Sequence, residues 1–167
     1  MIGVSRAVAG VLSRFGLPAV DVVSATVIAR PRADVAAFAA DPRNATRWYE
    51  NIESVRWETE PPLAVGSRLA FVARFLGRRL EYTYEIRELV AGERLVMSTS
   101  QGPFPMETTY TWADAGEGAT RMTLRNRGEP AGFTRVAAPL MTRAMRRANG
   151  QDLAALKALL ESRAAGN

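Results

Sequence analysis

Residues 106–127 have the sequence METTYTWADAGEGATRMTLRNR, and this stretch decides the fold class. Two alternating runs, 106–113 and 120–127, flank the turn sequence DAGEG at 114–118. Alternation with a period of two is typical of strands buried on one face, and short turns rich in Gly and Asp join antiparallel neighbours. The stretch therefore predicts an antiparallel β-hairpin. Its inward-facing positions are Met106, Thr108, Tyr110 and Trp112 on the first strand and Met122, Leu124 and Asn126 on the second.

The chain before this hairpin repeats the strand pattern. We predict strands at residues 20–30, 53–60, 67–76, 80–89 and 94–100, each followed shortly by Pro or Gly. Short connections between the later strands favour an antiparallel meander, which brings the expected sheet to seven strands. The inward-facing residues of the two central runs are Leu69, Phe71, Ala73, Phe75, Leu80, Tyr82, Tyr84 and Ile86. The inner face of the predicted sheet is therefore strongly aromatic.

Two short helices are predicted between the first and second strands. Residues 31–42 (PRADVAAFAADP) carry apolar side chains at helical spacing, with Asp34 as a candidate N-cap and the DP pair as the stop. Residues 44–52 (NATRWYENI) predict a second helix that begins at Asn44 or Thr46.

Residues 132–163 predict one long C-terminal helix, which Pro139 should kink or divide near its start. The apolar side of this helix is expected to run through Phe133, Val136, Leu140, Ala144, Ala148, Leu153, Leu156 and Leu160. A helix with such a side can cover the aromatic face of the sheet.

Residues 1–18 (MIGVSRAVAGVLSRFGLP) predict an amphipathic helix or extension that precedes the main domain at 19–163. Arg6 and Arg14 interrupt its apolar stretch, which argues against a secretory signal peptide. The alternatives are a short helix packed against the body, an over-extended translation start, and an interfacial helix that makes weak contact with a membrane surface through residues 1–16. Since the sequence contains no run of 18 apolar residues, no membrane span is predicted.

The composition excludes several classes of function. A chain of 167 residues fits one domain, and this one contains neither His nor Cys. Disulfides, the common zinc sites, and nucleophiles that depend on Cys or His are therefore excluded. Without His or Cys the available metal ligands are oxygens, and the sequence contains no acidic cluster of the density that such a site requires, so we expect no metal. The phosphate-loop and dinucleotide fingerprints, GxxxxGK(S/T) and GxGxxG, are also absent, and we expect no cofactor. The net charge of +5 is spread along the chain, with Lys157 as the single lysine, which argues against nucleic-acid binding.

The order of these elements is one strand, two short helices, six antiparallel strands and a long helix. This order resembles the helix-grip fold of the START-like (SRPBCC) superfamily and, within it, the polyketide cyclase/dehydrase-like proteins of bacteria. The resemblance covers residues 20–162. It is carried by DPRNATRWYENIESVRW at 41–57, PPLAVGSRLAF at 61–71, YTYEIRELVAGERLVM at 82–97, TTYTWADAGEGATRMTLR at 108–125 and APLMTRAMRRANGQDLAALKALLE at 138–161.

The resemblance implies an α+β, START/Bet v 1-like fold, in which a seven-stranded antiparallel sheet wraps around the last helix and leaves a deep, mostly apolar pocket. Members of the superfamily bind lipids, sterols, polyketides or plant hormones. A minority of them cyclise, aromatise or dehydrate polyketide chains. Any version of that chemistry that depends on histidine is excluded for this chain.

The alternation of the strands and the resemblance together predict the residues that line the pocket. They are Trp48, Tyr49, Phe71, Phe75, Tyr82, Tyr84, Met97, Tyr110, Trp112, Asn126, Met141 and Met145. The inward tyrosine hydroxyls either reach the rim of an ordinary core or orient a ligand carbonyl. Asn126 either satisfies loop backbone or anchors a polar ligand atom. Glu50 is the one carboxylate that we consider as a catalytic base, and the catalytic residues of any reaction are otherwise unknown.

These features predict a cytoplasmic protein, monomeric or dimeric, that binds a small hydrophobic or amphipathic molecule, lipid-like or polyketide-like, in an internal cavity. Two alternatives remain open. One is an enzyme of the polyketide cyclase, aromatase or dehydratase type that uses neither metal nor histidine. The other is a protein-interaction module with a vestigial pocket.

Overall fold

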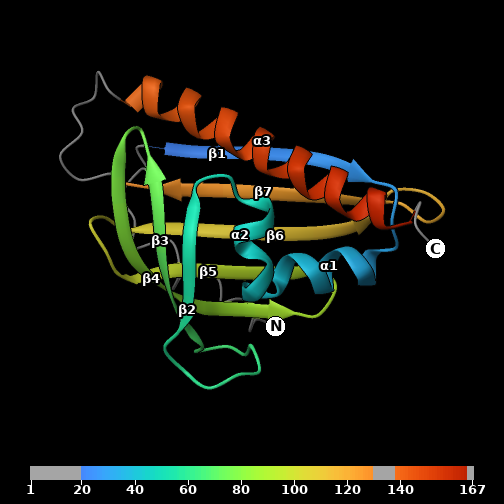
Figure 1. The fold of residues 1–167 in the computed structure, drawn as a ribbon, viewed down its shortest axis with the longest axis horizontal. Coiled ribbons are helices and arrows are strands. Elements are labelled where there is room, and N and C mark those ends of the chain that lie inside the picture. Colours follow the sequence, from blue (N-terminus) through green and yellow to red (C-terminus); the bar gives the residue numbers. More distant parts are fainter. Residues whose placement is uncertain (1–19, 130–137, 165–167) are drawn as a thin grey trace, which may run out of the picture.

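A computed structural model describes residues 20–129 and 138–164 of the chain. Its elements in chain order are β1 (Val20–Ile28), α1 (Arg32–Ala40), the 3-10 helix η1 (Pro42–Asn44), α2 (Ala45–Trp48), β2 (Ile52–Trp57), β3 (Arg68–Phe75), β4 (Arg78–Val90), β5 (Arg94–Gln101), β6 (Met106–Asp114), β7 (Thr120–Gly128) and α3 (Ala138–Ala164). The seven strands form one sheet in the order β1-β7-β6-β5-β4-β3-β2, and every neighbouring pair is antiparallel (Figure 1).

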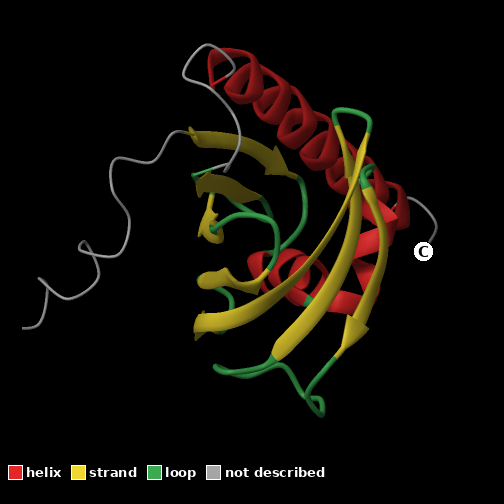
Figure 2. Ribbon diagram, turned by 90° about the vertical axis from the view of Figure 1, so that its left-hand side faces the viewer, coloured by secondary structure: helices red, strands yellow, loops and turns green. Residues whose placement is uncertain are grey.

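The first two strands follow each other in the chain and yet lie at opposite edges of the sheet. The segment between them, which contains α1, η1 and α2, therefore crosses in front of the sheet (Figure 1). The sheet is strongly curved, and α3 lies across its open side (Figure 2). This helix packs against β1 and α2. The arrangement confirms the predicted α+β helix-grip fold, whereas the predicted helix at 1–18 lies outside the described residues.

The element boundaries differ from the predictions at the first two helices and at the second strand. The second helix, predicted over residues 44–52, ends at Trp48, and Ile52 begins β2. Asp34 is not the N-cap of α1, because the helix begins at Arg32 and the carbonyl oxygen of Pro31 accepts the backbone N–H groups of Asp34 and Val35. Asp34 lies instead in the first turn and pairs with Arg30. The second strand ends at residue 57 rather than at 60. As described, α3 begins at Ala138, so residues 132–137 of the predicted helix lie outside the described part.

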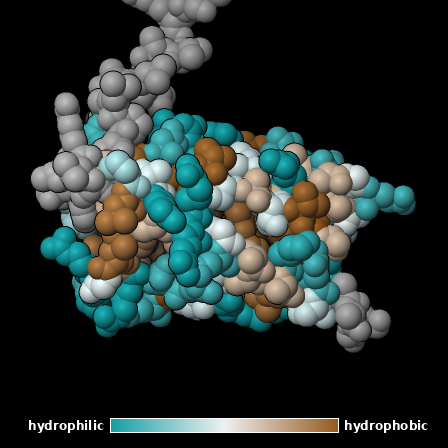
Figure 3. Space-filling model, turned by 90° about the horizontal axis from the view of Figure 1, so that it is seen from above, coloured by the Kyte–Doolittle hydropathy of each residue, from teal (hydrophilic) through white to brown (hydrophobic). Residues whose placement is uncertain are grey.

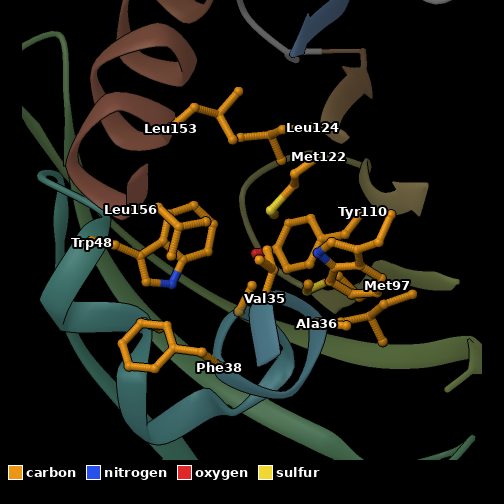
Figure 4. Close-up of a cluster of buried hydrophobic side chains, with 14 of the residues drawn as sticks. Val35, Ala36, Phe38, Trp48, Met97, Tyr110, Met122, Leu124, Leu153 and Leu156 are labelled. Carbon is orange, nitrogen blue, oxygen red and sulfur yellow. The ribbon is translucent and has the colours of Figure 1, made fainter. Parts of the chain in front are cut away.

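The main core lies between the sheet, the short helices and the C-terminal half of α3. Val35 and Phe38 of α1, Trp48 of α2, and Leu153 and Leu156 of α3 converge on side chains of the sheet (Figure 4). Burial of one such aliphatic or aromatic side chain contributes about 1.5–3 kcal/mol. This end of the molecule is therefore the well-packed end, and it fixes the position of α3 over the sheet.

A second, smaller cluster lies near the N-terminal end of α3. It contains Val20, Val22 and Met141, with Phe75 and Met145 packed against it. The sequence pattern places Leu140 on the apolar side of the helix, but this residue is 66% exposed, since the next residue, Met141, takes the inward position. The outward face over α3 carries mainly hydrophilic side chains with small separate apolar areas (Figure 3). Within residues 20–129 and 138–164, no helix is both long and apolar enough to cross a membrane.

Candidate ligand-binding cavity

A cavity of about 130 Å³ lies between the sheet and α3. At about 30 Å³ per water molecule it has room for about four waters, and it is comparable in volume to a cavity of about 150 Å³ that binds benzene. Its walls include Val20, Phe75, Met141 and Met145 of the smaller cluster and Phe71, Tyr84, Met97 and Tyr110 of the main core. The cavity therefore occupies the gap between the two apolar clusters.

Ten of the twelve predicted residues line this cavity. They are Tyr49, Phe71, Phe75, Tyr82, Tyr84, Met97, Tyr110, Asn126, Met141 and Met145. The strand residues among them share one face because they alternate along β3, β4, β5, β6 and β7. Inward-facing aromatic rings touch one another across this face: Phe71 stacks on Tyr82 at a centroid distance of 5.6 Å, and Tyr82 meets Tyr84 edge-on at 5.1 Å.

The two remaining predicted residues, Trp48 and Trp112, do not line the cavity. Trp48 is 1% exposed and Trp112 is 4% exposed, and both belong to the main core. The Trp48 ring packs on Tyr49 at a centroid distance of 3.9 Å and so supports a wall residue from behind. Both indole N–H groups are buried with no hydrogen-bond partner among the described residues.

A chain of hydrogen bonds crosses the polar side of the cavity from the sheet to α3. The hydroxyl of Thr108 donates to Asn126 Oδ1 at 2.6 Å, and Asn126 Nδ2 donates to Asn149 Oδ1 at 2.8 Å. The Tyr84 hydroxyl lies 2.9 Å from the same Thr108 oxygen. Because the Thr108 proton is already committed, Tyr84 must be the donor in that bond. Burial raises the pKa of Tyr84 to about 12, and the bond to Thr108 partly opposes this rise.

The direction of these bonds settles two open questions about the predicted residues. Asn126 does not satisfy loop backbone, since its amide links β7 to α3. Tyr84 cannot donate to a ligand, because its proton is used inside the protein. At the far end of the chain of bonds, Asn149 Nδ2 is buried with no partner among the residues that the structure describes.

Three other tyrosines bring hydroxyl groups to the cavity. Tyr49 and Tyr110 bond to each other through their hydroxyls. The hydroxyl of Tyr82 makes no hydrogen bond within residues 20–129 and 138–164. Burial is the main cause that raises the pKa of all three hydroxyls well above the usual value. They remain neutral at physiological pH and can act as hydrogen-bond donors or as weak acids, but not as bases.

Among the described residues that line this cavity, Asp152 is the one carboxylate, and it was not among the residues predicted from the sequence. The residue is 3% exposed, and its Oδ1 atom accepts a 3.0 Å hydrogen bond from the backbone N–H of Glu50. Burial raises the pKa of Asp152 to about 6, the Glu50 N–H bond opposes the rise, and the negative charge of the Glu50 side chain adds to it. The group is thus mainly ionised at neutral pH and can accept a proton near pH 6.

Glu50, which the sequence analysis considered as a catalytic base, is an exposed residue that does not line the cavity. Its backbone, rather than its carboxylate, serves the site. The missed signal was in the helix pattern: Met141, Met145, Asn149 and Asp152 recur at spacings of four, four and three residues. Asn and Asp in an inward-facing helical stripe indicate polar groups aimed at the interior.

Two arginines also line the cavity, and each has an acidic partner. Arg74 of β3 is exposed and forms an ion pair with Glu53. Arg127 Nη2 of β7 lies 2.8 Å from Glu107 Oε1. Their charges are therefore balanced next to the cavity. In contrast, no Arg or Lys in the described part of the chain pairs with Asp152.

Comparison with known proteins supports the same fold. A family model described as "Polyketide cyclase / dehydrase and lipid transport" matches residues 19–161. A search of curated proteins finds no match.

Solved structures with the same fold share little sequence with this chain. A protein of Thermus thermophilus has a TM-score of 0.75 and 21% identity, over 88% of this chain and 99% of that one. The Zhui aromatase/cyclase of Streptomyces sp. R1128 has a TM-score of 0.74 and 16% identity, over 88% and 98%. A START superfamily protein of Mycobacterium smegmatis has a TM-score of 0.72 and 14% identity, over 85% and 97%. At these identities the likeness concerns the fold alone.

Proposed function

Because the chain belongs to the polyketide cyclase / dehydrase and lipid transport family, we propose that it binds a small hydrophobic or amphipathic molecule in the cavity between the sheet and α3. The single observation that carries the proposal is the cavity itself, whose walls are mostly aromatic and methionine side chains with a few buried polar groups. Small-molecule sites have this composition, since apolar walls supply affinity and a few polar groups fix the orientation.

Size should dominate the affinity. Each buried CH₂ group of a ligand contributes about 0.8 kcal/mol, whereas one neutral hydrogen bond adds about 0.5–1.5 kcal/mol net. A cavity of about 130 Å³ is close in volume to an engineered cavity of about 150 Å³ that binds benzene, so it suits a body of one to two aromatic rings. Naphthalene, with two fused rings, is at the upper end of this range. Methionines at one end of the cavity, Met141 and Met145, can adjust to modest differences in ligand shape.

The test is a titration of 2-methylnaphthalene into the protein, followed by ligand fluorescence or calorimetry. Ala73 lines the cavity and is 6% exposed, so Ala73→Trp should fill the space and abolish binding. Ala70→Trp is the matched control, because residue 70 lies on the same strand with its side chain on the opposite face. If folded Ala73→Trp binds as well as the wild type, the ligand does not occupy this cavity.

A second candidate function is an enzyme of the polyketide cyclase or dehydratase type. The observation that favours it is Asp152, a cavity carboxylate whose pKa is raised to about 6 by burial. Such a group can take a proton from a carbon next to a ligand carbonyl, because its pKa lies near physiological pH. The tyrosine hydroxyls of the cavity are neutral donors that can stabilise the resulting enolate oxygen.

Proton abstraction can be tested without knowledge of the natural substrate. A small aryl ketone such as 2-acetylnaphthalene is incubated with the protein in D₂O, and exchange at the methyl group next to the carbonyl is followed by NMR. An enzyme should accelerate the exchange, and Asp152→Asn should remove the acceleration while the ketone still binds. Equal exchange rates with wild type, with Asp152→Asn and with buffer would leave binding as the function.

A further inference from the structure

The polar wall of the cavity on α3 contains a hydrogen-bond donor that the protein does not use. Asn149 is 3% exposed, and its Nδ2 atom has no partner among the described residues although it lines the cavity. A rotation of the Asn149 amide by 180° would not satisfy this N–H group, because it would break the 2.8 Å hydrogen bond that Asn149 Oδ1 accepts from Asn126 Nδ2. An unpaired buried N–H costs about 1–3 kcal/mol relative to a paired one, so this site is built to receive an acceptor.

The same wall contains an acceptor that is only half used. Asp152 lies three residues after Asn149 and thus on the neighbouring turn of the same helix face. Its Oδ1 atom takes the Glu50 backbone N–H, and its second carboxylate oxygen makes no hydrogen bond within the described residues. Buried carboxylates are normally paired or fully hydrogen-bonded. Asp152 therefore needs a donor that the described part of the chain does not provide.

We infer that Asn149 and Asp152 form one donor–acceptor subsite for the polar end of the ligand. The subsite takes a neutral group in which a carbonyl oxygen stands near an N–H or O–H, such as a carboxamide or a hydroxy-ketone, and it selects this group over a carboxylate on the same apolar body. The carbonyl accepts from Asn149 Nδ2, and the N–H or O–H donates to the free oxygen of Asp152. The inference rests on the proposed function and names the ligand class of that cavity.

The charges around the subsite favour a neutral ligand. The groups that face Asp152 are the hydroxyls of Tyr49, Tyr82 and Tyr110 and the exposed carboxylate of Glu50. All of these are neutral or negative at physiological pH. The two arginines of the cavity wall are engaged by Glu53 and Glu107. A ligand carboxylate would consequently meet Asp152 without a compensating cation, whereas an amide would satisfy both free atoms.

Four probes with one apolar body test the selection. They are 2-naphthamide, which offers acceptor and donor, methyl 2-naphthoate, which offers an acceptor only, 2-naphthoate, which is a carboxylate, and 2-methylnaphthalene, which is apolar. At pH 8 Asp152 is ionised, so the wild type should bind the amide about ten- to a hundred-fold more tightly than the ester, the change that one hydrogen bond to a charged group gives. It should bind the carboxylate more weakly than any neutral probe.

Two isosteric variants assign the effect to the two residues. Asp152→Asn should raise the affinity for 2-naphthoate about ten-fold or more, since it removes a like charge from contact distance. Asn149→Asp keeps an oxygen that accepts from Asn126 Nδ2 and removes the unpaired N–H donor. It should therefore weaken the binding of the amide and of the ester but not the binding of 2-methylnaphthalene. Arg146→Gln is the matched control, because Arg146 is exposed on the outer side of the same helix and should change no affinity.

A measurement on the wild type supports the test if either variant fails to fold. In ¹⁵N-labelled protein the side-chain NH₂ resonances of Asn149 should shift on addition of 2-naphthamide and much less on addition of 2-methylnaphthalene. If 2-methylnaphthalene binds and Ala73→Trp blocks it, but the amide is not preferred or the variants keep the wild-type ranking, the subsite is rejected and the cavity function stands. If no probe binds, the proposed function and the subsite both fail.

Discussion

Asp152 should make the stability of the fold depend on pH in the direction opposite to that of an ordinary paired carboxylate. Burial raises the pKa of this group from the usual 3.8 to about 6, so the folded protein holds the proton more tightly than the unfolded chain does. The stabilisation that comes from the protonated form is fully present below about pH 4 and is lost as the pH rises through 6. A difference of about two pKa units corresponds to on the order of 3 kcal/mol.

Asp152→Asn isolates this contribution. The amide keeps an oxygen that can accept from the Glu50 backbone N–H, which Asp152 binds at 3.0 Å, and it does not titrate. The free energy of unfolding of the variant minus that of the wild type should therefore increase by on the order of 3 kcal/mol from pH 4 to pH 8. For a chain of this length, the Tm of the variant minus that of the wild type should increase by about 6–12 °C over the same range.

The assay is urea unfolding of both proteins at pH 4, 5, 6, 7 and 8, with thermal unfolding as the second measure. Asp21 and Asp41 have lowered pKa values because they accept hydrogen bonds from Arg125 and Arg43. The stabilisation that these two carboxylates contribute to the fold is therefore lost as the pH falls. These groups are common to the two proteins and cancel in the difference. A difference in unfolding free energy that stays constant from pH 4 to pH 8 would refute the assignment of a raised pKa to Asp152.

Three further predictions concern the packing around the cavity. Leu156→Ala should cost about 2–5 kcal/mol in urea unfolding, because Leu156 is fully buried in the main core and truncation leaves a void. Gly128→Ala should lower the Tm, since a Cβ atom at this position would lie 2.6 Å from the backbone oxygen of Pro105, and an unchanged Tm would contradict the close approach. Thr108→Val should lower the free energy of unfolding in urea by about 1–3 kcal/mol, which is more than Tyr84→Phe should cost. The reason is that Thr108→Val removes the hydrogen-bond partner of both the Tyr84 hydroxyl and Asn126 Oδ1.

The strand part of the site could be predicted from the sequence because alternation has a direct physical meaning. Successive side chains of a strand point to opposite faces, so Arg121 and Arg125 on one face imply that Met122 and Asn126 lie on the other. The structure places Met122 in the core and Asn126 on the cavity wall. Residue type alone cannot separate a wall from a core, and for this reason the sequence assigns Trp48 and Trp112 to the cavity although they pack behind it.

The helix part could not be predicted with the same certainty. Alanine is frequent in 138–164, so several faces of the helix have similar apolar character and the direction of the inward stripe is poorly defined. The pattern places Leu140 inward, where the structure exposes it, and it omits Asn149 and Asp152, which the structure buries. The contacts that orient α3 come from β1 and α2, which are distant in sequence, and no local pattern contains them.

The two buried polar residues of α3 are best explained by a role in binding. Leu153, Leu156 and Leu160 continue the same helix into the main core, so apolar side chains at 149 and 152 would extend that packing and stabilise the fold. The chain instead carries an amide with an unpaired N–H and a carboxylate without a cation at these two positions. Both costs fall where α3 borders the cavity, and the buried side chains that follow on the described part of the helix are all apolar. Destabilising polar groups that line a cavity are the pattern expected of a functional site. The unpaired N–H of Asn149 requires a hydrogen-bond acceptor on the ligand, and the unpaired carboxylate oxygen of Asp152 requires a donor.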